Sequence, residues 1–534
     1  MVRLIPALFF LIILWPLRVD GAPRVSEGFS IEPLLKVGDL LSGITSDERG
    51  VVVCEYDLGR ILRITLESTI EVLAENLQTP VDVEYVEGAL WVLLEQPGQI
   101  ISIDPASGDR RTIIESLEGP TAFARGKNQE LYVIEYLEGC LLEVDSESKE
   151  IRVLRDDLDG PADIAILPGG DIMIAEQVGL DFIEGRLTRI SPDGRIVSRT
   201  PLPDATGLAV GPDGTLFIST FSIGEAHHSP RSWGGIVSLR NGQLRIVAQG
   251  LIGPTSLTVL PDGRLAVIEE TTNSIFLVDR NGSTRPLIRG FSAPEAIGVF
   301  PDGDIAVLEG FPSAKISFVR DGTVGEPIWS MDSLPAFPPT MAQGNDGLLY
   351  VLDPLMGVLH VLRRSGEPAA RFQVSFVRYL ASDPFGGVAL LTPGALVRVG
   401  PEGIIDSSPV HAGNAFGFFI RGNGHAVIVD ENLAEVEEIG RYRTTGVAHC
   451  GMGEGQGSDR CLFTTSSGKD LWFAFQGDNT LFLKREGTDQ TVMEGLEGIV
   501  ALAAGADDSV VVGTSRGGLY RVSVKTSVVD WRLY

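Results

Sequence analysis

Short apolar runs alternate with turn-forming residues along almost the whole chain. Between residues 254 and 288 the runs SLTV, LAVI and SIFLVD are separated by the segments LPDG and ETTN, and STRPLI follows the turn RNG. Val and Ile in short runs between Gly, Pro, Asn and Asp are typical of β-strands joined by tight turns. Four such strands in about 40 residues are the size of one propeller blade.

This unit occurs twelve times, with a copy roughly every 40 residues. A solenoid is the structural alternative, but its coils are usually shorter and contain fewer reversals. The sequence therefore predicts an all-β fold made of four-stranded propeller blades. We call the position equivalent to Pro254 the anchor of each copy, and the anchors lie near Leu40, Pro80, Pro120, Pro161, Ala205, Pro254, Pro294, Pro338, Val377, Ala415, Asp459 and Ile499.

Twelve blades in a single ring would leave a wide and poorly filled channel. Two six-bladed rings avoid this, and a split into seven and five blades is the weaker alternative because five blades make a small ring. We predict two six-bladed propellers in tandem, over residues 23–290 and 291–534. The strand-like segment FSIEPLLKV, residues 29–37, is expected to pair into the blade that closes the first ring.

Several copies resemble the repeats of known propellers. The segments PDGTLFIST, PDGRLAVIE, PDGDIAVLE and GALWVLLEQPGQIISID are similar to repeats of NHL-type propellers and of the virginiamycin B lyase and gluconolactonase groups. The resemblance covers nearly the whole chain and implies a β-propeller, whereas these folds host lyases, lactonases and plain binding domains. The lyase group's Glu-Pro-His-Gly run is absent, and the gluconolactonases' asparagine-glycine pattern is absent from the positions just after the anchors.

The N-terminus has the pattern of a secretory signal peptide. An arginine precedes an apolar run of about 14 residues, Leu4 to Leu17, and the small residues Gly21 and Ala22 follow. The run is short for a membrane span and contains two prolines, so a non-cleaved anchor is the weaker alternative. We predict that residues 1–22 are removed and that the mature chain is secreted or periplasmic, with no membrane span.

The net charge of −28 at pH 7 argues against nucleic acid as a partner, because phosphate binding requires clustered Lys and Arg. Four cysteines are few for an exported chain of 534 residues, so the fold is not expected to depend on disulfides. Cys450 and Cys461 flank a glycine-rich segment of ten residues and are predicted to form a disulfide. Cys54 and Cys140 lie in apolar runs of different repeats, where we predict buried thiols rather than a mutual bridge.

An acidic residue recurs at the end of the second predicted strand in most copies. A carboxylate repeated in blade after blade can accept backbone N–H groups of the following turn, whereas catalysis requires one or two carboxylates placed differently from the rest. We therefore interpret these residues as scaffold. The twelve positions hold Glu55, Glu95, Glu135, Glu176, Thr220, Glu269, Glu309, Asp353, Thr392, Asp430, Ala474 and Thr514.

The fifth copy departs from this pattern. Thr220 replaces the acid, and the following loop lengthens to FSIGEAHHSPRSWGG, residues 221–235. Because binding residues concentrate on long loops, we predict a ligand site over the axis of the first propeller. An enlarged loop in the fourth copy, around Asp181 and Glu184, is expected to shield the same face. The predicted ligand residues are Glu225, His227, His228 and Trp233, with Thr206 and Thr255 from the starts of two inner strands.

Acidic residues just after the anchors indicate a second possible site. Asp82 and Asp163 stand two residues after an anchor proline, and Glu295 follows Pro294 directly. By analogy with gluconolactonases, these three acids would hold a divalent ion, Ca²⁺, Zn²⁺ or Mg²⁺, at the channel mouth. The alternative is that such buried acids bond the amides of strand edges. The histidines of the fifth copy are a further candidate for zinc or another divalent ion.

Two functions from different classes are compatible with these patterns. The first is an exported double propeller that binds a protein, a glycan or a small ligand on one face of the first propeller. The second is a metal-dependent hydrolase or lyase that acts on a small ester, lactone or cyclic substrate. The sequence contains no complete catalytic set, which favours binding.

Overall fold

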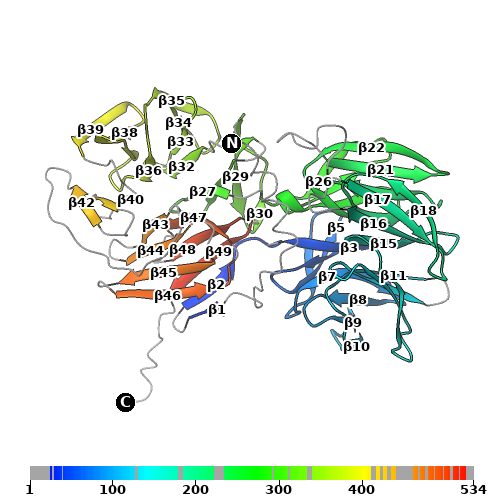
Figure 1. Ribbon diagram of the computed structural model, residues 1–534. Helices are drawn as coiled ribbons and strands as arrows, with labels where there is room; N and C mark the ends of the chain where they lie inside the picture. The colour runs from blue at the N-terminus through cyan, green and yellow to red at the C-terminus, as the bar shows by residue number, and fades with distance from the viewer. Residues whose placement is uncertain are drawn as a thin grey trace, which may run out of the picture. The chain divides into compact units, whose positions relative to one another are not determined.

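The computed structural model consists almost entirely of β-strands (Figure 1). In the described part of the chain the one helical element is the short 3₁₀ helix η1 (Glu270–Thr272). No helix among the described residues is long and apolar enough to cross a membrane. The structure describes residues 24–26, 29–38, 40–126, 130–178, 184–221, 234–291, 294–310, 313–332, 339–410, 417–420, 425–429, 435–439, 461–466, 470–475, 479–485, 488–496, 498–504, 509–515 and 517–524.

The first compact unit spans residues 37–290 and contains six sheets of four antiparallel strands. Each sheet is made of strands that follow one another in the sequence, because each tight turn returns the chain beside the strand it has just left. From the first blade to the sixth, the strands are β3 (Leu41–Asp47), β4 (Gly50–Glu55), β5 (Arg60–Thr65), β6 (Ile70–Ala74); β7 (Pro80–Val86), β8 (Ala89–Leu94), β9 (Gln99–Ile103), β10 (Arg110–Ile114); β11 (Pro120–Arg125), β12 (Leu131–Glu135), β13 (Cys140–Val144), β14 (Ile151–Arg155); β15 (Pro161–Ile166), β16 (Ile172–Val178), β17 (Glu184–Ile190), β18 (Ile196–Pro201); β19 (Ala205–Val210), β20 (Leu216–Thr220), β21 (Gly234–Arg240), β22 (Gln243–Leu251); β23 (Pro254–Val259), β24 (Leu265–Glu269), β25 (Ser274–Val278) and β26 (Thr284–Ile288).

The innermost strand of each blade is the first in sequence. Strands β3, β7, β11, β15, β19 and β23 contact one another in a closed circuit. Neighbouring blades bury apolar side chains between their sheet faces: Leu93 and Ile100 of the second blade pack in one cluster with Phe123 and Val133 of the third. Burial of apolar surface between blades therefore holds the ring together.

The second unit comprises residues 23–36 and 291–534 and also contains six sheets. Its innermost strands β27, β32, β36, β40, β43 and β47 again contact one another in a closed circuit. The predicted all-β fold, with about twelve blades in two six-bladed propellers, is confirmed. The strands are β1 (Arg24–Val25), β2 (Phe29–Pro33), β27 (Pro294–Val299), β28 (Ile305–Glu309), β29 (Ala314–Arg320), β30 (Thr323–Val324), β31 (Trp329–Met331), β32 (Thr340–Gln343), β33 (Leu349–Asp353), β34 (Val358–Leu362), β35 (Pro368–Gln373), β36 (Tyr379–Ser382), β37 (Val388–Leu391), β38 (Ala395–Gly400), β39 (Gly403–Pro409), β40 (Gly417–Ile420), β41 (Ala426–Val429), β42 (Glu435–Ile439), β43 (Cys461–Ser466), β44 (Asp470–Phe475), β45 (Thr480–Arg485), β46 (Thr488–Glu494), β47 (Ile499–Ala504), β48 (Val510–Thr514) and β49 (Leu519–Val524).

The N-terminal strands belong to the second ring. β2 pairs antiparallel with β49, with Phe29 opposite Val524, and β1 pairs with β46. Phe29 is buried, and its ring lies edge-on to that of Trp472 with 6.1 Å between centroids. The expectation that residues 29–37 close the first ring is therefore wrong, because this segment finds its ladder and its apolar partners in the last blades. Figure 1 shows β1 and β2, in blue, beside the orange and red strands β46 and β49.

The first ring closes without a strand from elsewhere. Asn273, buried and left-handed at the end of η1, accepts a hydrogen bond from the N–H of Leu41 at 3.0 Å. Its amide group also donates to the C=O of Gly38. Ser46 Oγ donates to the C=O of Val259 at 3.1 Å. These side-chain bonds and the apolar side chains between them join the sixth blade to the first, and we call this junction the seam of the first ring.

Candidate functional site

The recurring glutamates fasten the loop that leads into each blade. In four blades of the first ring, the carboxylate accepts the backbone N–H of the residue 17 positions earlier. A buried N–H left without such an acceptor would cost free energy, so the carboxylates are scaffold groups as predicted. The shared backbone donor lies before the first strand, however, and not in the turn after the second. The pairs are Glu55 with Gly38, Glu135 with Glu118, Glu176 with Asp159 and Glu269 with Ile252.

Asp82 and Asp163 bond the backbone at bulges of the innermost strands. The strand register shifts directly after the anchor in both β7 and β15, which leaves backbone groups without ladder partners. Asp82 accepts the N–H of Val83 at 2.8 Å and that of Phe123, on the next blade, at 3.0 Å. Asp163 bonds its own strand and the fifth blade in the same way, at 2.7 and 2.6 Å. Both carboxylates therefore tie one blade to the next.

Hydroxyl groups tie other junctions of the same ring. Thr206 Oγ1 donates to the C=O of Pro254 at 2.9 Å and lies 2.9 Å from Ser219 Oγ. Ser42 and Thr121 donate in the same way to the anchor carbonyl of the blade that follows each, at 3.0 and 3.4 Å. Thr206, predicted as a ligand residue, is thus buried and bonded within the scaffold.

Thr255 interrupts this series. Its Oγ1 atom is buried and has no hydrogen-bond partner among the residues that the structure describes. The next blade around the ring is the first, where Leu41 takes part in the seam with Asn273 instead of the regular junction. Because an unpaired buried hydroxyl costs free energy, a polar atom placed beside Thr255 would be stabilised. The prediction that Thr255 binds a ligand is not tested by this arrangement.

Glu84 lies on β7, two residues beyond Asp82 and on the same face of the strand. No other described residue forms a hydrogen bond with its carboxyl group. Burial, and then the charges of Asp82 and Asp163, raise the pKa of Glu84 to about 8, and Arg125 opposes this rise. Arg125 forms its ion pair with Glu87 instead, at 3.1 Å. Glu84 is therefore an acid without a fixed partner beside two others.

Burial also raises the pKa of both aspartates. That of Asp163 rises to about 8, with the charge of Asp82 as the second cause, and that of Asp82 rises to about 6. Their backbone hydrogen bonds act in the opposite direction and are outweighed. All three acids nevertheless retain partial exposure to solvent. The inner face of the first ring thus holds three acids that resist ionisation, chiefly because they are buried and, for Glu84 and Asp163, also because nearby negative charges repel them.

The sequence interpretation did not single out Glu84. It can be found by comparing the same inner-strand position in all repeats, because no other blade of the first ring has an acid there. Residues are equivalent here when they pair, in the strand register of their own blade, with the same position of the second strand. In the other five blades they are Thr45, Ala124, Ala165, Ala209 and Thr258.

The predicted metal ligands are divided between the two units. Asp82 and Asp163 belong to the first, whereas Glu295 lies on β27 of the second. In the described residues, no group of three or more His, Cys, Asp or Glu side chains is arranged to hold a metal ion. The two aspartates act as junction groups, as expected of buried acids that bond the amides of strand edges, and the metal site stays a prediction.

Several predicted residues lie outside the described part of the chain. These include Glu225, His227, His228 and Trp233, as well as Asp181 and Cys450. The strands that flank the two enlarged loops are described: the pairs Ala205–Thr220 and Pro161–Glu176 show that both loops leave the ring at the end where the inner strands begin. Cys461 begins β43, and its side chain is not described, so the disulfide with Cys450 stays a prediction. Cys54 and Cys140 are free as predicted, Cys54 buried and Cys140 partly exposed.

No family model matches the chain, and no curated protein matches it. Several solved structures are similar to parts of the chain. A streptogramin B lyase is 17% identical with a TM-score of 0.37, covering 53% of this chain and 96% of its own. The hydrazine synthase of Kuenenia stuttgartiensis is 14% identical (TM-score 0.37, 54% and 97% covered), and a nidogen/laminin complex is 16% identical (TM-score 0.36, 47% and 90%). The lyase-like propeller resemblance is borne out, and at these identities it concerns the fold alone.

Proposed function

We propose that this chain is an exported binding protein whose first ring receives a positively charged group of its ligand beside Glu84. The observation that carries the proposal is a carboxyl group on an innermost strand that has no hydrogen-bond partner among the described residues. The neighbouring acids Asp82 and Asp163 are held by backbone N–H groups and cannot turn away from it. A cation at this point favours the ionised form of Glu84, which burial and the charges of the two aspartates oppose.

Because the pKa of Glu84 is raised to about 8, the proposal predicts that binding is coupled to proton release. At pH 7 the group is mostly protonated, and a bound ammonium or guanidinium group favours its ionised form. Binding therefore releases a proton near neutral pH and becomes tighter as the pH rises from 6 to about 9.

The second class of function, a metal-dependent hydrolase or lyase, has less support. Each carboxylate oxygen of Asp82 and Asp163 already accepts a backbone N–H bond. A metal ion would compete with these four bonds, two of which join neighbouring blades. The described residues offer no third ligand arranged with these two, so binding of an organic cation fits the donor set better.

Isothermal titration calorimetry with agmatine and spermidine tests the proposal, with CaCl₂ in parallel. We expect the wild type to bind the amines and to release protons at pH 7, detected as a heat that depends on the ionisation enthalpy of the buffer. Glu84→Gln should weaken binding at least tenfold. Glu115→Gln, an exposed acid of the same ring, removes the same charge and should change nothing. Equal binding of the amines by Glu84→Gln and wild type would refute the proposal.

A further inference from the structure

The fourth strands of five blades in the first ring carry charge of one sign. In β10, β14, β18, β22 and β26 every charged residue is an arginine, although the chain as a whole has a net charge of −28. Each of these strands is the outermost of its sheet, and we call their exposed side the outer wall of the first ring (Figure 1). The arginines of the outer wall are Arg110, Arg111, Arg152, Arg155, Arg199, Arg245 and Arg285.

The outer strands of neighbouring blades lie side by side. A Cβ added at Gly194, in the turn before β18, would lie 3.1 Å from the carbonyl oxygen of Leu154 on β14. A Cβ added at Gly282, in the turn before β26, would lie 2.2 Å from the carbonyl oxygen of Val247 on β22. The fold therefore gathers arginines from five separate segments of the sequence into one wall, although the sequence itself contains no basic run there.

Protection of strand edges does not explain this choice of residue. Charged side chains on an outer strand hinder pairing with another chain, and charges of either sign serve that purpose. The second ring uses both signs, so edge protection alone does not require arginine. In its fourth strands β35, β39 and β46 the charged residues are Arg371, Asp406, Asp489 and Glu494.

Three arginines on three different blades are available to a partner. Arg111, Arg199 and Arg285 are exposed, and none of them forms an ion pair or a side-chain hydrogen bond with another residue that the structure describes. The two arginines of β14, in contrast, already have acidic partners. A guanidinium group presents a planar fork of N–H donors that matches a carboxylate or sulfate group.

Acidic residues limit the outer wall at both ends of its strands. Asp109 and Glu115 stand directly before and after β10, and Glu150 and Asp156 directly before and after β14. All four are exposed, and a strand of five residues is only about 17 Å long. A broad anionic surface, such as a lipid bilayer or a nucleic-acid duplex, would meet these acids. A single polymer chain laid across the strands would contact the arginines without them.

We propose that the outer wall of the first ring binds a linear acidic polysaccharide, whose uronate or sulfate groups pair with arginines of successive blades. The outside of a ring is convex, so its arginines diverge and do not surround one small anion. Contacts that are weak singly add up on one polymer through effective concentration. Val153 and Ile246, 56% and 57% exposed on the same wall, offer apolar contacts to the C–H faces of sugar rings. Glu84 lies on an innermost strand, so this proposal is independent of the cation site.

Biolayer interferometry with immobilised alginate and dextran sulfate tests the proposal, with neutral dextran, a DNA duplex and vesicles of anionic phospholipid in parallel. We expect the wild type to bind at least one of the two acidic polysaccharides and not dextran. Binding should weaken at least tenfold when NaCl rises from about 50 to about 300 mM, because salt screens exposed charges. The triple variant Arg111→Gln, Arg199→Gln, Arg285→Gln should bind at least tenfold more weakly than the wild type.

The matched control removes the same charge from exposed arginines of the second ring and should leave binding unchanged. It is the triple variant Arg320→Gln, Arg363→Gln, Arg371→Gln. Glu84→Gln should also bind the polysaccharides as the wild type does, which separates this surface from the cation site. Equal weakening by both triple variants would show that net charge alone attracts the polymer and would overturn the proposal. Binding of neither polysaccharide, or tighter binding of the duplex or the vesicles, would overturn it as well.

Discussion

The two rings share one architecture and close in different ways. In the first ring every blade consists of four consecutive strands, and the seam depends on Asn273 and on apolar side chains. In the second ring the last blade receives its outermost strand, β2, from residues that precede the whole first ring. The first ring is thus inserted between β2 and the rest of the second. It can close once residue 290 has been made, whereas the second must wait for β49.

This difference separates a main-chain seal from a side-chain seal. A shared sheet seals the second ring with main-chain hydrogen bonds between its two distant segments, and loop-closure entropy opposes their meeting. Side-chain bonds seal the first ring, where Leu41 and Asn273 are 232 residues apart, so the entropic cost is similar and the seal depends on one asparagine. The two seams should therefore fail independently and with different severity.

The largest effect is expected from deletion of residues 24–33, which removes β1 and β2. The change exposes the edge of β49 and removes Phe29 from its place beside Trp472. Truncation of one buried Phe alone costs about 3–5 kcal/mol, so we expect the second ring to lose more than this. Hydrogen–deuterium exchange should show lost protection in β47, β48 and β49 and unchanged protection in the first ring.

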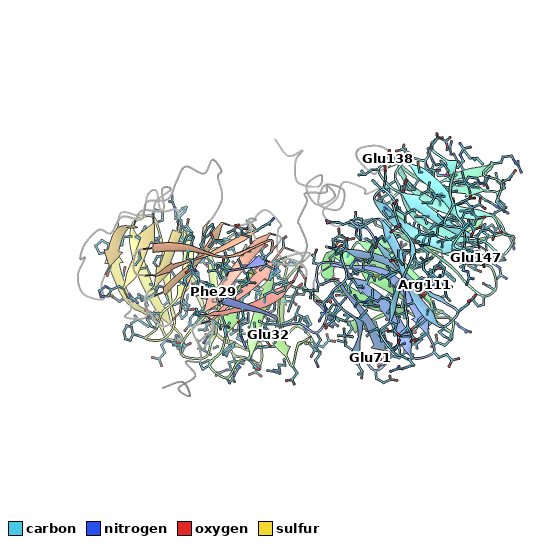
Figure 2. The ribbon with its side chains drawn as sticks, turned by 90° about the horizontal axis from the view of Figure 1, so that it is seen from below. Phe29, Glu32, Glu71, Arg111, Glu138 and Glu147 are labelled. Carbon is cyan, nitrogen blue, oxygen red and sulfur yellow. The ribbon has the colours of Figure 1, made fainter. Side chains whose placement is uncertain are left out.

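Glu32→Gln is the control for this deletion, because Glu32 lies on the same strand and is exposed. Figure 2 labels Glu32 next to Phe29 on that strand, and Glu71, Arg111, Glu138 and Glu147 on the first unit. The substitution should leave both rings unchanged. Equal loss of protection in the two rings after the deletion would show that they do not close independently.

The second effect concerns the seam of the first ring. Asn273→Ala leaves the N–H of Leu41 and the C=O of Gly38 without their partners, and each buried orphan costs about 1–3 kcal/mol. We expect the first ring to lose stability by about 2–4 kcal/mol, measured by thermal unfolding and by hydrogen exchange in β3 and β23. The second ring should keep its stability.

Asn241→Ala separates the hydrogen bonds from the backbone conformation. Asn241 is also left-handed, with φ 50°, but it is exposed in the turn between β21 and β22. Asn241→Ala therefore introduces the same backbone strain but removes none of the hydrogen bonds of the seam. If both variants destabilise the first ring equally, the bonds of Asn273 contribute nothing and the seam is apolar only.

The blades could be predicted from the sequence, and the seams could not. Pro-Asp-Gly turns and apolar runs specify each hairpin locally, so twelve copies reveal twelve blades. Asn273, in contrast, resembles any turn asparagine, and its partner Leu41 is 232 residues away. The segment around Phe29 has the pattern of a strand, but a periodic pattern does not say which open edge it will join.

The candidate sites show the same limit. Asp82 and Asp163 were correctly seen as inner acids, but only the contacts to Phe123 and Leu208 decide that they join blades. Glu84 could not be predicted as a site residue, because its importance depends on the residues near it in space and not on a sequence motif.

The smallest expected effect is a loss of stability of the first ring as the pH rises. The folded-state pKa values of Glu84 and Asp163, about 8, lie above their ordinary values of 4.5 and 3.8. Between about pH 4 and pH 8 the folded ring therefore binds more protons than the unfolded chain. Its stability must fall as the pH rises through this window, and the destabilisation is complete above about pH 8.

Glu84→Gln removes one of these titrating groups and should stabilise the first ring at pH 9 but not at pH 4. One pKa unit corresponds to about 1.4 kcal/mol, and partial solvent exposure reduces the effect, so we expect a gain of about 1–2 kcal/mol. Urea unfolding from pH 4 to 9, with each ring followed by pulse-labelling mass spectrometry, measures it. The second ring and the Glu115→Gln variant provide the reference curves. Constant stability of the wild-type first ring from pH 5 to 9 would show that the three acids are solvated and have ordinary pKa values. The two rings would then differ only in how they close.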